Sequence, residues 1–241
     1  MIWFDGDWPH HPFSEKDEYF KPGGSFEYGK LFDMIHTLQP NTVIQNNRHE
    51  EPLPGEDIQG FEQDLPGANS AGFNETRIFN MPLEVCMTIN DHWGICADDD
   101  NHKSTRQLIH YLVRSTSVGA NYLLNVGPNA EGEILPVHAQ RLRAMGEWLK
   151  VNGEAIYGTR AGKISPTADV VSTSKGAVHY VHALNYVSDC IKLPGLSGDY
   201  QATLLKDDSP VKSVVKDGDL VLTIPAEQRD PMDTVVKLTL R

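Results

Sequence analysis

The chain has 241 residues, of which 39% are hydrophobic, and it carries a formal net charge of −12 with a pI of about 5.2. This length and composition fit one large globular domain or two smaller ones. The acidic balance disfavours phosphate backbones and anionic lipid, so we expect no nucleic-acid or membrane partner. No apolar run approaches the ~20 residues that a membrane-spanning helix needs.

The first half of the chain is predicted to alternate strands and helices, as α/β proteins do. Residues 2–5 read as a buried strand. A helix is expected from Ser25, which can cap it, to Leu38, and a strand over 42–45. The Pro/Gly-rich segment 47–82 is predicted to be a long loop, and such loops in compact domains are usually functional.

Four further elements are expected up to about residue 160. The pattern predicts a strand over 83–89, a helix over 104–118, a strand over 122–126 and a helix from Pro136 to Gly153. Pro136 suits the first position of a helix, where its missing N–H costs nothing, and a glycine commonly ends one.

The periodicity changes after Gly162, where strand patterns follow one another without a helix between them. Turn signals such as Leu-Ser-Gly-Asp separate these strands, which is typical of a small antiparallel β-sandwich. The predicted strands cover residues 178–184, 201–205, 220–224 and 234–240. We therefore expect an α/β domain over 1–160 and a β domain over 161–241.

The three cysteines are Cys86, Cys96 and Cys190. An odd number without a CxxC pattern gives neither a disulfide framework nor a zinc signature, so we expect buried free thiols. The start of the chain lacks a basic segment followed by an apolar one, so no signal peptide is visible.

A carboxylate stands at the end of the first predicted strand, in Ile-Trp-Phe-Asp-Gly over residues 2–6. In α/β barrels the reactive residues lie at the C-terminal ends of strands, so Asp5 would emerge at the rim. Trp3, Phe4 and Trp8 surround it in sequence, and flat aromatic faces suit the apolar face of a sugar ring. The alternative is a simple turn, in which Asp before Gly is common.

Two more charged residues follow at positions that suit catalysis. Arg48 comes just after the strand over 42–45 and can hold a carboxylate ionised or bind a sugar oxygen, although a rim salt bridge fits equally well. Glu62 lies in the predicted loop, where partial burial would raise its pKa and suit a general acid. The alternative for Glu62 is an ordinary solvated charge.

Metal and cofactor sites are not expected. His10 and His11 lack further ligands at metal-binding spacing. Residues 98–101 (Asp-Asp-Asp-Asn) lack the alternation, glycine and terminal glutamate of a calcium loop, so we interpret them as a solvated run before a helix N-terminus.

Several longer motifs carry a family resemblance. They are IWFDG (2–6), QNNRH (45–49), DIQGFEQDLPG (57–67), LEVCMTINDHWG (83–94), NYLLNVGPNAEGEI (121–134) and GEWLKVNGEAIYGT (146–159). In this order and spacing the chain resembles glycoside hydrolase family 29, the α-L-fucosidases. The resemblance implies the C-terminal portion of a (β/α)8-like TIM barrel followed by a β-sandwich.

The resemblance also implies a retaining exo-glycosidase that hydrolyses terminal α-L-fucosides of glycans through a covalent fucosyl-enzyme, without a cofactor. Asp5 matches the nucleophile and Glu62 the general acid/base. Glu84 is the less favoured candidate for the acid/base, because it stands at the start of a predicted strand. Asp64 lies close enough to Glu62 in sequence to be confused with it.

Three residues match positions that contact the sugar, namely Arg48, Trp3 and Trp93. The family's barrel begins upstream of the nucleophile strand, so the chain is expected to be a fragment that is marginally stable or aggregates in isolation. The alternative is an inactive remnant or a carbohydrate-binding protein of the same fold. Family members are mostly secreted, periplasmic or lysosomal.

Overall fold

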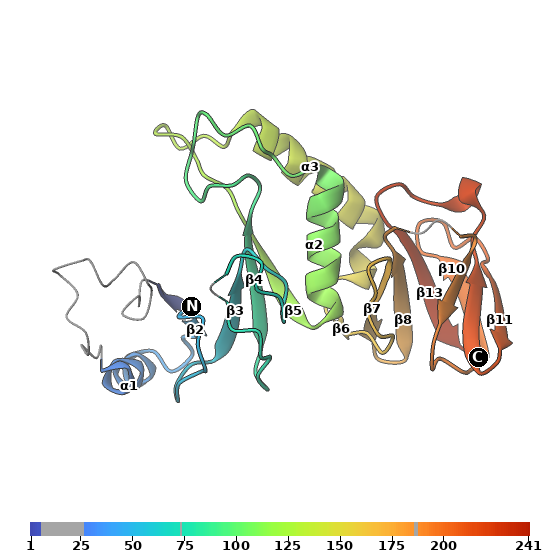
Figure 1. The fold of residues 1–241 in the computed structure, drawn as a ribbon, viewed down its shortest axis with the longest axis horizontal. Helices are drawn as coiled ribbons and strands as arrows, with labels where there is room; N and C mark the ends of the chain where they lie inside the picture. Colours follow the sequence, from blue (N-terminus) through green and yellow to red (C-terminus); the bar gives the residue numbers. More distant parts are fainter. Residues whose placement is uncertain (6–26, 73, 186–187) are drawn as a thin grey trace. The chain divides into compact units, whose positions relative to one another are not determined.

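A computed structural model describes residues 1–5, 27–72, 74–185 and 188–241 of the chain (Figure 1). These residues form two compact units, 1–87 and 88–241. Each unit is described by itself, and the predicted domain boundary at residue 160 stays a prediction. The fold is mixed α/β, with parallel strands in the first unit and antiparallel sheets in the second.

Four parallel strands in sequence order make up the first unit. They are β1 (Ile2–Phe4), β2 (Ile44–Asn46), β3 (Ile58–Glu62) and β4 (Leu83–Thr88). All six residues of β4 are buried, as is usual for a strand of a parallel sheet. The helix α1 (Tyr28–Leu38) packs by its rings on β1, with Phe4 and Phe32 centroids 5.3 Å apart.

The prediction of one long loop over residues 47–82 is wrong, because β3 lies inside it. Gly60 stands in the middle of this strand, and glycine weakens strand propensity. Hydrogen bonds to β2 on one side and β4 on the other stabilise the strand, although its local sequence has weak strand propensity. Glu62 is therefore the last residue of a strand rather than part of a mobile loop.

The second unit begins with two helices that flank a strand. They are α2 (Thr105–Ser117), β5 (Ala120–Asn125) and α3 (Pro136–Asn152), followed by the short helix η2 (Gly153–Ala155). Ser104 caps α2 in a reciprocal capping box with Gln107, and Pro136 opens α3. The predicted helices over 104–118 and from Pro136 are thus confirmed.

Two antiparallel sheets complete this unit. One has the order β10-β13-β8-β7-β6 and the other the order β11-β12-β9. The strands are β6 (Arg160–Ala161), β7 (Val170–Lys175), β8 (Val178–Ala183), β9 (Cys190–Leu193), β10 (Tyr200–Leu204), β11 (Lys212–Lys216), β12 (Asp219–Thr223) and β13 (Thr234–Leu240). The four predicted strands are confirmed as β8, β10, β12 and β13, whereas β6, β7, β9 and β11 were not predicted. The short η3 (Ala226–Gln228) precedes β13.

Two apolar clusters stabilise the second unit. One lies between the two sheets and includes Leu193, Leu222 and Val236. The other joins α2 and α3 to β7, β8 and β13, for example through Ile109 and Trp148. Figure 1 shows both helices beside these strands. Burial of large side chains contributes roughly 1.5–3 kcal/mol each, so the second cluster attaches the helices firmly to the sheet.

Polar side chains of α2 reinforce this attachment. Arg106 donates to the carbonyls of Leu184 (2.7 Å) and Pro231 (2.8 Å), and a ring nitrogen of His110 lies 2.8 Å from the Met232 carbonyl. These carbonyls belong to the loops that follow β8 and precede β13, so the helix satisfies backbone groups that the sheet leaves unpaired.

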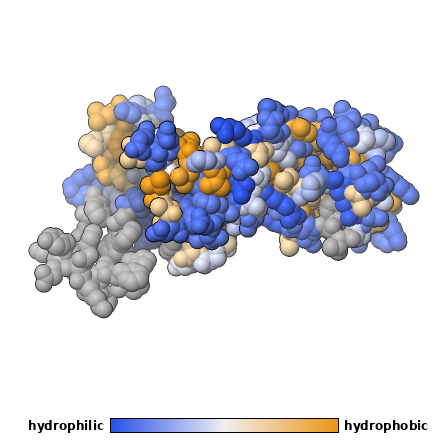
Figure 2. All heavy atoms as spheres, turned by 90° about the horizontal axis from the view of Figure 1, so that it is seen from above, coloured by the Kyte–Doolittle hydropathy of each residue, from blue (hydrophilic) through white to orange (hydrophobic). Residues whose placement is uncertain are grey.

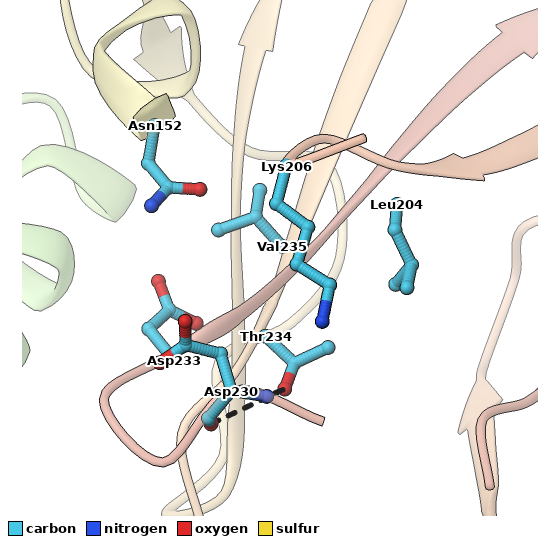
Figure 3. A pocket seen from close by; sticks show the side chains of 7 residues that line it. All are labelled: Asn152, Leu204, Lys206, Asp230, Asp233, Thr234 and Val235. Carbon is cyan, nitrogen blue, oxygen red and sulfur yellow. Dashed lines mark hydrogen bonds between the residues drawn. The ribbon is translucent and has the colours of Figure 1, made fainter. Parts of the chain in front are cut away.

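A fully buried histidine–aspartate hydrogen bond lies inside the five-stranded sheet. His182 Nδ1 of β8 is 2.6 Å from Asp233 Oδ2, and both side chains are 0% exposed. Thr173 of β7 donates to the Ala155 carbonyl of η2 and lies 3.5 Å from His182 Nε2. Figure 3 shows Asp233 beside Asn152, Lys206 and Asp230 in a small cavity. The pair links two strands near the end of α3.

The surface agrees with the acidic, polar composition. On the face drawn in Figure 2 most residues are hydrophilic, and the apolar residues gather in patches between them. None of the described helices is long and apolar enough to span a membrane. Of the three thiols, Cys86 is buried as expected, whereas Cys96 is half-buried and Cys190 exposed, against the prediction.

Candidate active site

One face of the parallel sheet is polar. The register aligns Trp3 with Gln45, Gly60 with Glu84, and Glu62 with Cys86. Side chains alternate between the two faces of a strand, and aligned residues of parallel strands share a face. The polar face therefore carries Trp3, Gln45, Glu62, Glu84 and Cys86, while Ile44, Phe61, Val85 and Met87 point to the other face.

Asp5 follows β1 two residues after Trp3, so the alternation of side chains directs it to the polar face as well. Burial raises the pKa of Cys86 to about 12, and the negative charges of Glu62, Glu84 and Asp5 add to the shift. A charge acts on a titrating group in this way only at short range. The structure thus brings Asp5 and Glu62, two residues 57 positions apart in sequence, to one region of the sheet.

Because Gly60 has no side chain, neighbouring polar groups can lie directly over β3 at this point of the polar face. A Cβ atom at Gly60 would lie 2.7 Å from Gln45 Nε2 and 3.0 Å from the Asn46 carbonyl oxygen. The Gln45 side chain and the Asn47 side chain, whose Oδ1 would be 3.4 Å away, therefore lie across β3. Any larger residue would displace them.

Glu62 ends β3 with its carboxyl group partly open to solvent, at 19% exposure. Asn47 Nδ2 donates to Glu62 Oε2 at 3.4 Å, and His49 Nε2 lies 3.5 Å from the same oxygen. Asn74 accepts from the Glu62 N–H and donates to its carbonyl, which fixes the backbone at this point. Such a carboxyl group, held in place yet reachable, can exchange protons with a substrate.

Asp64 and Glu84 are placed differently from Glu62. Asp64 is buried and accepts hydrogen bonds from Ser70, from the Ala71 N–H at 2.9 Å and from Asn74 at 3.2 Å, so it holds the loop after β3 together. Glu84 is 7% exposed and lies one row deeper than Glu62 on the polar face. Burial raises the pKa of Glu84, and the Gln45 amide opposes this shift.

Arg48 is engaged by carboxylates of its own loop. Its side chain is 4% exposed, and it donates from Nε and Nη2 to the two oxygens of Glu56 at 3.1 and 3.2 Å. It also donates to Glu50 at 3.2 Å and lies 5.3 Å from the centre of the Tyr28 ring. Burial lowers the pKa of Arg48, but the hydrogen bond and charge of Glu56 outweigh it, so the pKa is raised. Its contact with substrate stays a prediction.

Trp93 belongs to the second unit and lies on the loop that follows β4. Its side chain is 39% exposed, and its carbonyl accepts a hydrogen bond from Asn125 Nδ2 at 2.7 Å. The structure does not place Trp93 relative to the residues of the first unit. Its contact with substrate therefore also stays a prediction.

The acidic run before α2 is exposed at Asp98, Asp100 and Asn101, as predicted, but not at Asp99. Asp99 is buried and accepts hydrogen bonds from His92 Nδ1 at 2.7 Å and from the N–H groups of Asp91 and Asn101, each at 2.9 Å. The His92 hydrogen bond is the largest cause that lowers the pKa of Asp99 to about 2. Within the described ranges no cluster of three His, Cys, Asp or Glu side chains suits a metal ion.

Sequence reasoning missed the residues that support the candidate carboxylates. Glu56, His49 and Asn74 contact Arg48 or Glu62 but follow no recognisable spacing. Only His49 carried a signal, as the last residue of the QNNRH motif. Trp8, His10 and His11 lie outside the residues that the structure describes.

Comparison with known proteins gives a consistent result. A family model described as α-L-fucosidase matches residues 1–154. The tissue α-L-fucosidase of Bos taurus is 41% identical over 109 residues, and the plasma α-L-fucosidase of Homo sapiens is 40% identical over 118 residues. The solved structure of α-L-fucosidase isoenzyme 1 from Paenibacillus thiaminolyticus superposes with a TM-score of 0.76 at 34% identity.

The alignments cover a larger share of this chain than of the proteins that it matches. The alignments cover 43% and 46% of this chain but only 23% and 25% of the two curated relatives. The structural match covers 93% of this chain and 56% of the Paenibacillus chain. The chain thus spans about a quarter of the length of the curated relatives that it matches.

Proposed function

The chain belongs to the α-L-fucosidase family, and from this membership we propose that it carries the two catalytic carboxylates of a retaining exo-glycosidase acting on terminal α-L-fucosides. The observation that carries the proposal is the polar face of the parallel sheet. Asp5 and Glu62 both act on the Cys86 thiol there, although they come from different strands. Retention requires two carboxyl groups about 5–5.5 Å apart, which is the separation that the proposal expects for Asp5 and Glu62.

In the first step of the proposed reaction, an Asp5 carboxylate oxygen attacks the anomeric carbon of the fucosyl group. The bond from that carbon to the leaving oxygen breaks, and Glu62 gives its proton to this oxygen. In the second step Glu62 takes a proton from water. The water oxygen bonds to the anomeric carbon, and the carboxylate of Asp5 leaves, so the configuration is retained and both residues return to their starting states.

Each carboxylate has surroundings that suit its role. Asp5 directly follows β1, where a nucleophile on a strand end is held by the sheet. Glu62 is partly exposed beside His49 and Asn47, so it can reach both a substrate and water. Asp64 is less suitable, because three hydrogen-bond donors of its own loop occupy its oxygens.

The finer description of the fold is part of the same proposal. We infer that the parallel strands are the C-terminal portion of a (β/α)8-like barrel and that residues 161–241 form a β-sandwich. The parallel order of β1 to β4 and the apolar cluster between the two antiparallel sheets support these assignments. Trp3, Arg48 and Trp93 are proposed to contact the fucosyl group, and no cofactor is needed for this chemistry.

A second candidate is a protein that binds fucosylated glycans without turnover. The exposed Trp93 fits it, because an aromatic face can bind a sugar ring without any chemical step. The two candidates differ in what loss of Asp5 does. A binding protein would keep its affinity for fucose, whereas an enzyme would lose its turnover.

The test uses the protein expressed from its own gene and an aryl α-L-fucoside. Asp5→Gly should lower kcat by at least a thousandfold, and azide should restore turnover with formation of the β-fucosyl azide. Glu62→Gly with azide should give the α-fucosyl azide, because the Asp5 intermediate still forms. Asp64→Asn and Glu84→Gln serve as matched carboxylate controls. Ordinary activity in Asp5→Gly would overturn the assignment.

A further inference from the structure

Trp93 stands on an exposed loop whose backbone is nonetheless tightly held. The loop follows β4, and both Trp93 and Ile95 expose large apolar side chains, at 39% and 47%. Binding residues are often found on loops that a rigid scaffold positions. The second unit supplies the support from two directions.

The first support is Asn125, the last residue of β5. Its side-chain Nδ2 donates to the Trp93 carbonyl at 2.7 Å. Among polar side chains of this size only asparagine offers an uncharged N–H donor here, since aspartate has acceptors alone. The bond therefore fixes the orientation of the peptide group between Trp93 and Gly94.

The second support is Gly127, two residues further along. A Cβ atom at this position would lie 2.5 Å from the Gly94 carbonyl carbon, 2.7 Å from the Ile95 nitrogen and 2.8 Å from the Gly94 oxygen. All three are backbone atoms and cannot rotate away as a side chain would. Only glycine allows the 125–127 segment to pack directly against the peptide after Trp93.

The residues before Trp93 are held from the other side. Asp99 accepts hydrogen bonds from His92 Nδ1 and from the Asp91 N–H. The Lys103 ammonium donates to the carbonyls of Thr88 at 2.9 Å and Asn90 at 3.3 Å. The loop backbone is thus fixed directly before and directly after Trp93, while the indole itself stays open.

We propose that Asn125 and Gly127 are positioning residues that hold Trp93 in place for contact with the sugar. This inference rests on the proposed function, in which Trp93 contacts the fucosyl group. When an exposed aromatic residue is already held in its binding position, binding does not have to order the loop, so its entropic cost is smaller. Loss of the support should therefore weaken ground-state binding and leave the chemical step at Asp5 nearly unchanged.

The first measurement is independent of catalysis. The protein is labelled with 5-fluorotryptophan, and the ¹⁹F resonance of Trp93 is assigned with Trp93→Phe. Asn125→Asp, which keeps the side-chain shape but removes the donor, should shift, broaden or split this resonance, and Gly127→Ala should do the same. Asn129→Ala is the control, because among the described residues Asn129 bonds within its own turn, for example to Glu133. An unchanged Trp93 resonance in Asn125→Asp would overturn the proposal.

The second measurement is a double-mutant cycle in KM for an aryl α-L-fucoside. Asn125→Asp should raise KM about fivefold with kcat within twofold, and Trp93→Ala should raise it as much or more. In the double variant Asn125→Asp should add little, because its effect acts through the indole. Independent effects that multiply would overturn the proposal. If Asp5→Gly kept its activity instead, the proposed function would fail, whatever the resonance of Trp93 showed.

Discussion

Removal of the Asp233 carboxylate should strongly destabilise the second unit. His182 and Asp233 are both 0% exposed, and His182 Nδ1 lies 2.6 Å from Asp233 Oδ2. Asp233→Ala would leave this nitrogen buried without its partner, since the other ring nitrogen faces Thr173 at 3.5 Å. Breaking a buried pair from one side costs about 3–5 kcal/mol.

The expected change in melting temperature follows from the size of the chain. For proteins of roughly 150–250 residues, 1 kcal/mol shifts Tm by about 2–4 °C, so Asp233→Ala should lower Tm by about 6–20 °C. Trp148 is a suitable fluorescent reporter, because it packs in the same apolar cluster as Tyr180 and Val235. Thermal unfolding is followed by tryptophan emission, to which Trp148 contributes, with calorimetry as a second probe.

Two comparisons make the reasoning refutable. Asp207 is an exposed aspartate of the same unit whose side chain accepts hydrogen bonds from the neighbouring Ser209, for example from its N–H at 3.0 Å. Asp207→Ala should therefore change stability by no more than about 1 kcal/mol. The double variant His182→Phe/Asp233→Ala should lose much less than the sum of its single variants, because no orphaned group remains. Equal losses for Asp233→Ala and Asp207→Ala would refute the account of the pair.

Two further predictions concern the polar face. Burial raises the pKa of Glu84 above its ordinary 4.5, so the folded state binds this proton more tightly than the unfolded state. The stability that the protonated Glu84 supplies is complete below pH 4.5 and declines as pH rises through the raised pKa. The Tm of Glu84→Gln should therefore rise relative to that of the wild type between pH 4 and 7. A Tm difference that stays constant over this range would contradict the prediction. Cys86, with a pKa of about 12, should resist a thiol reagent at pH 8 that modifies the exposed Cys190 within minutes, and equal rates would contradict this.

Much of the fold could be predicted where local signals agree with tertiary packing. Ser104 and Pro136 mark the starts of α2 and α3 because capping and a fixed φ act within one turn. β3 was missed because Gly60 interrupts its apolar pattern and pairing with β2 and β4 stabilises it. β7 was missed for another reason: Ser172 and Thr173 are polar, yet they are buried and hydrogen-bonded to neighbouring backbone.

In the candidate site, too, some residues could be predicted from the sequence and others could not. Asp5 could be proposed from sequence because a carboxylate at a strand end has a recognisable context, and Glu62 because of its place in the DIQGFEQDLPG motif of the family that the chain resembles. The bond between Arg48 and Glu56 could not, since it depends on the course of a loop that no periodicity describes. Likewise Asp99 reads as a solvated charge, but the fold turns it inward against His92. Residue type thus indicated candidates, and only the fold decided their partners.

The most direct test of the central claim is to trap the covalent intermediate on the protein expressed from its own gene. Incubation with a 2-deoxy-2-fluoro-α-L-fucosyl fluoride slows the second step more than the first, so the fucosyl-enzyme accumulates. After proteolysis, mass spectrometry locates the label. We predict that the label is attached to Asp5, and that Asp5→Gly takes up none. A label on Glu62, Glu84 or another carboxylate, or the same labelling in Asp5→Gly, would contradict the account.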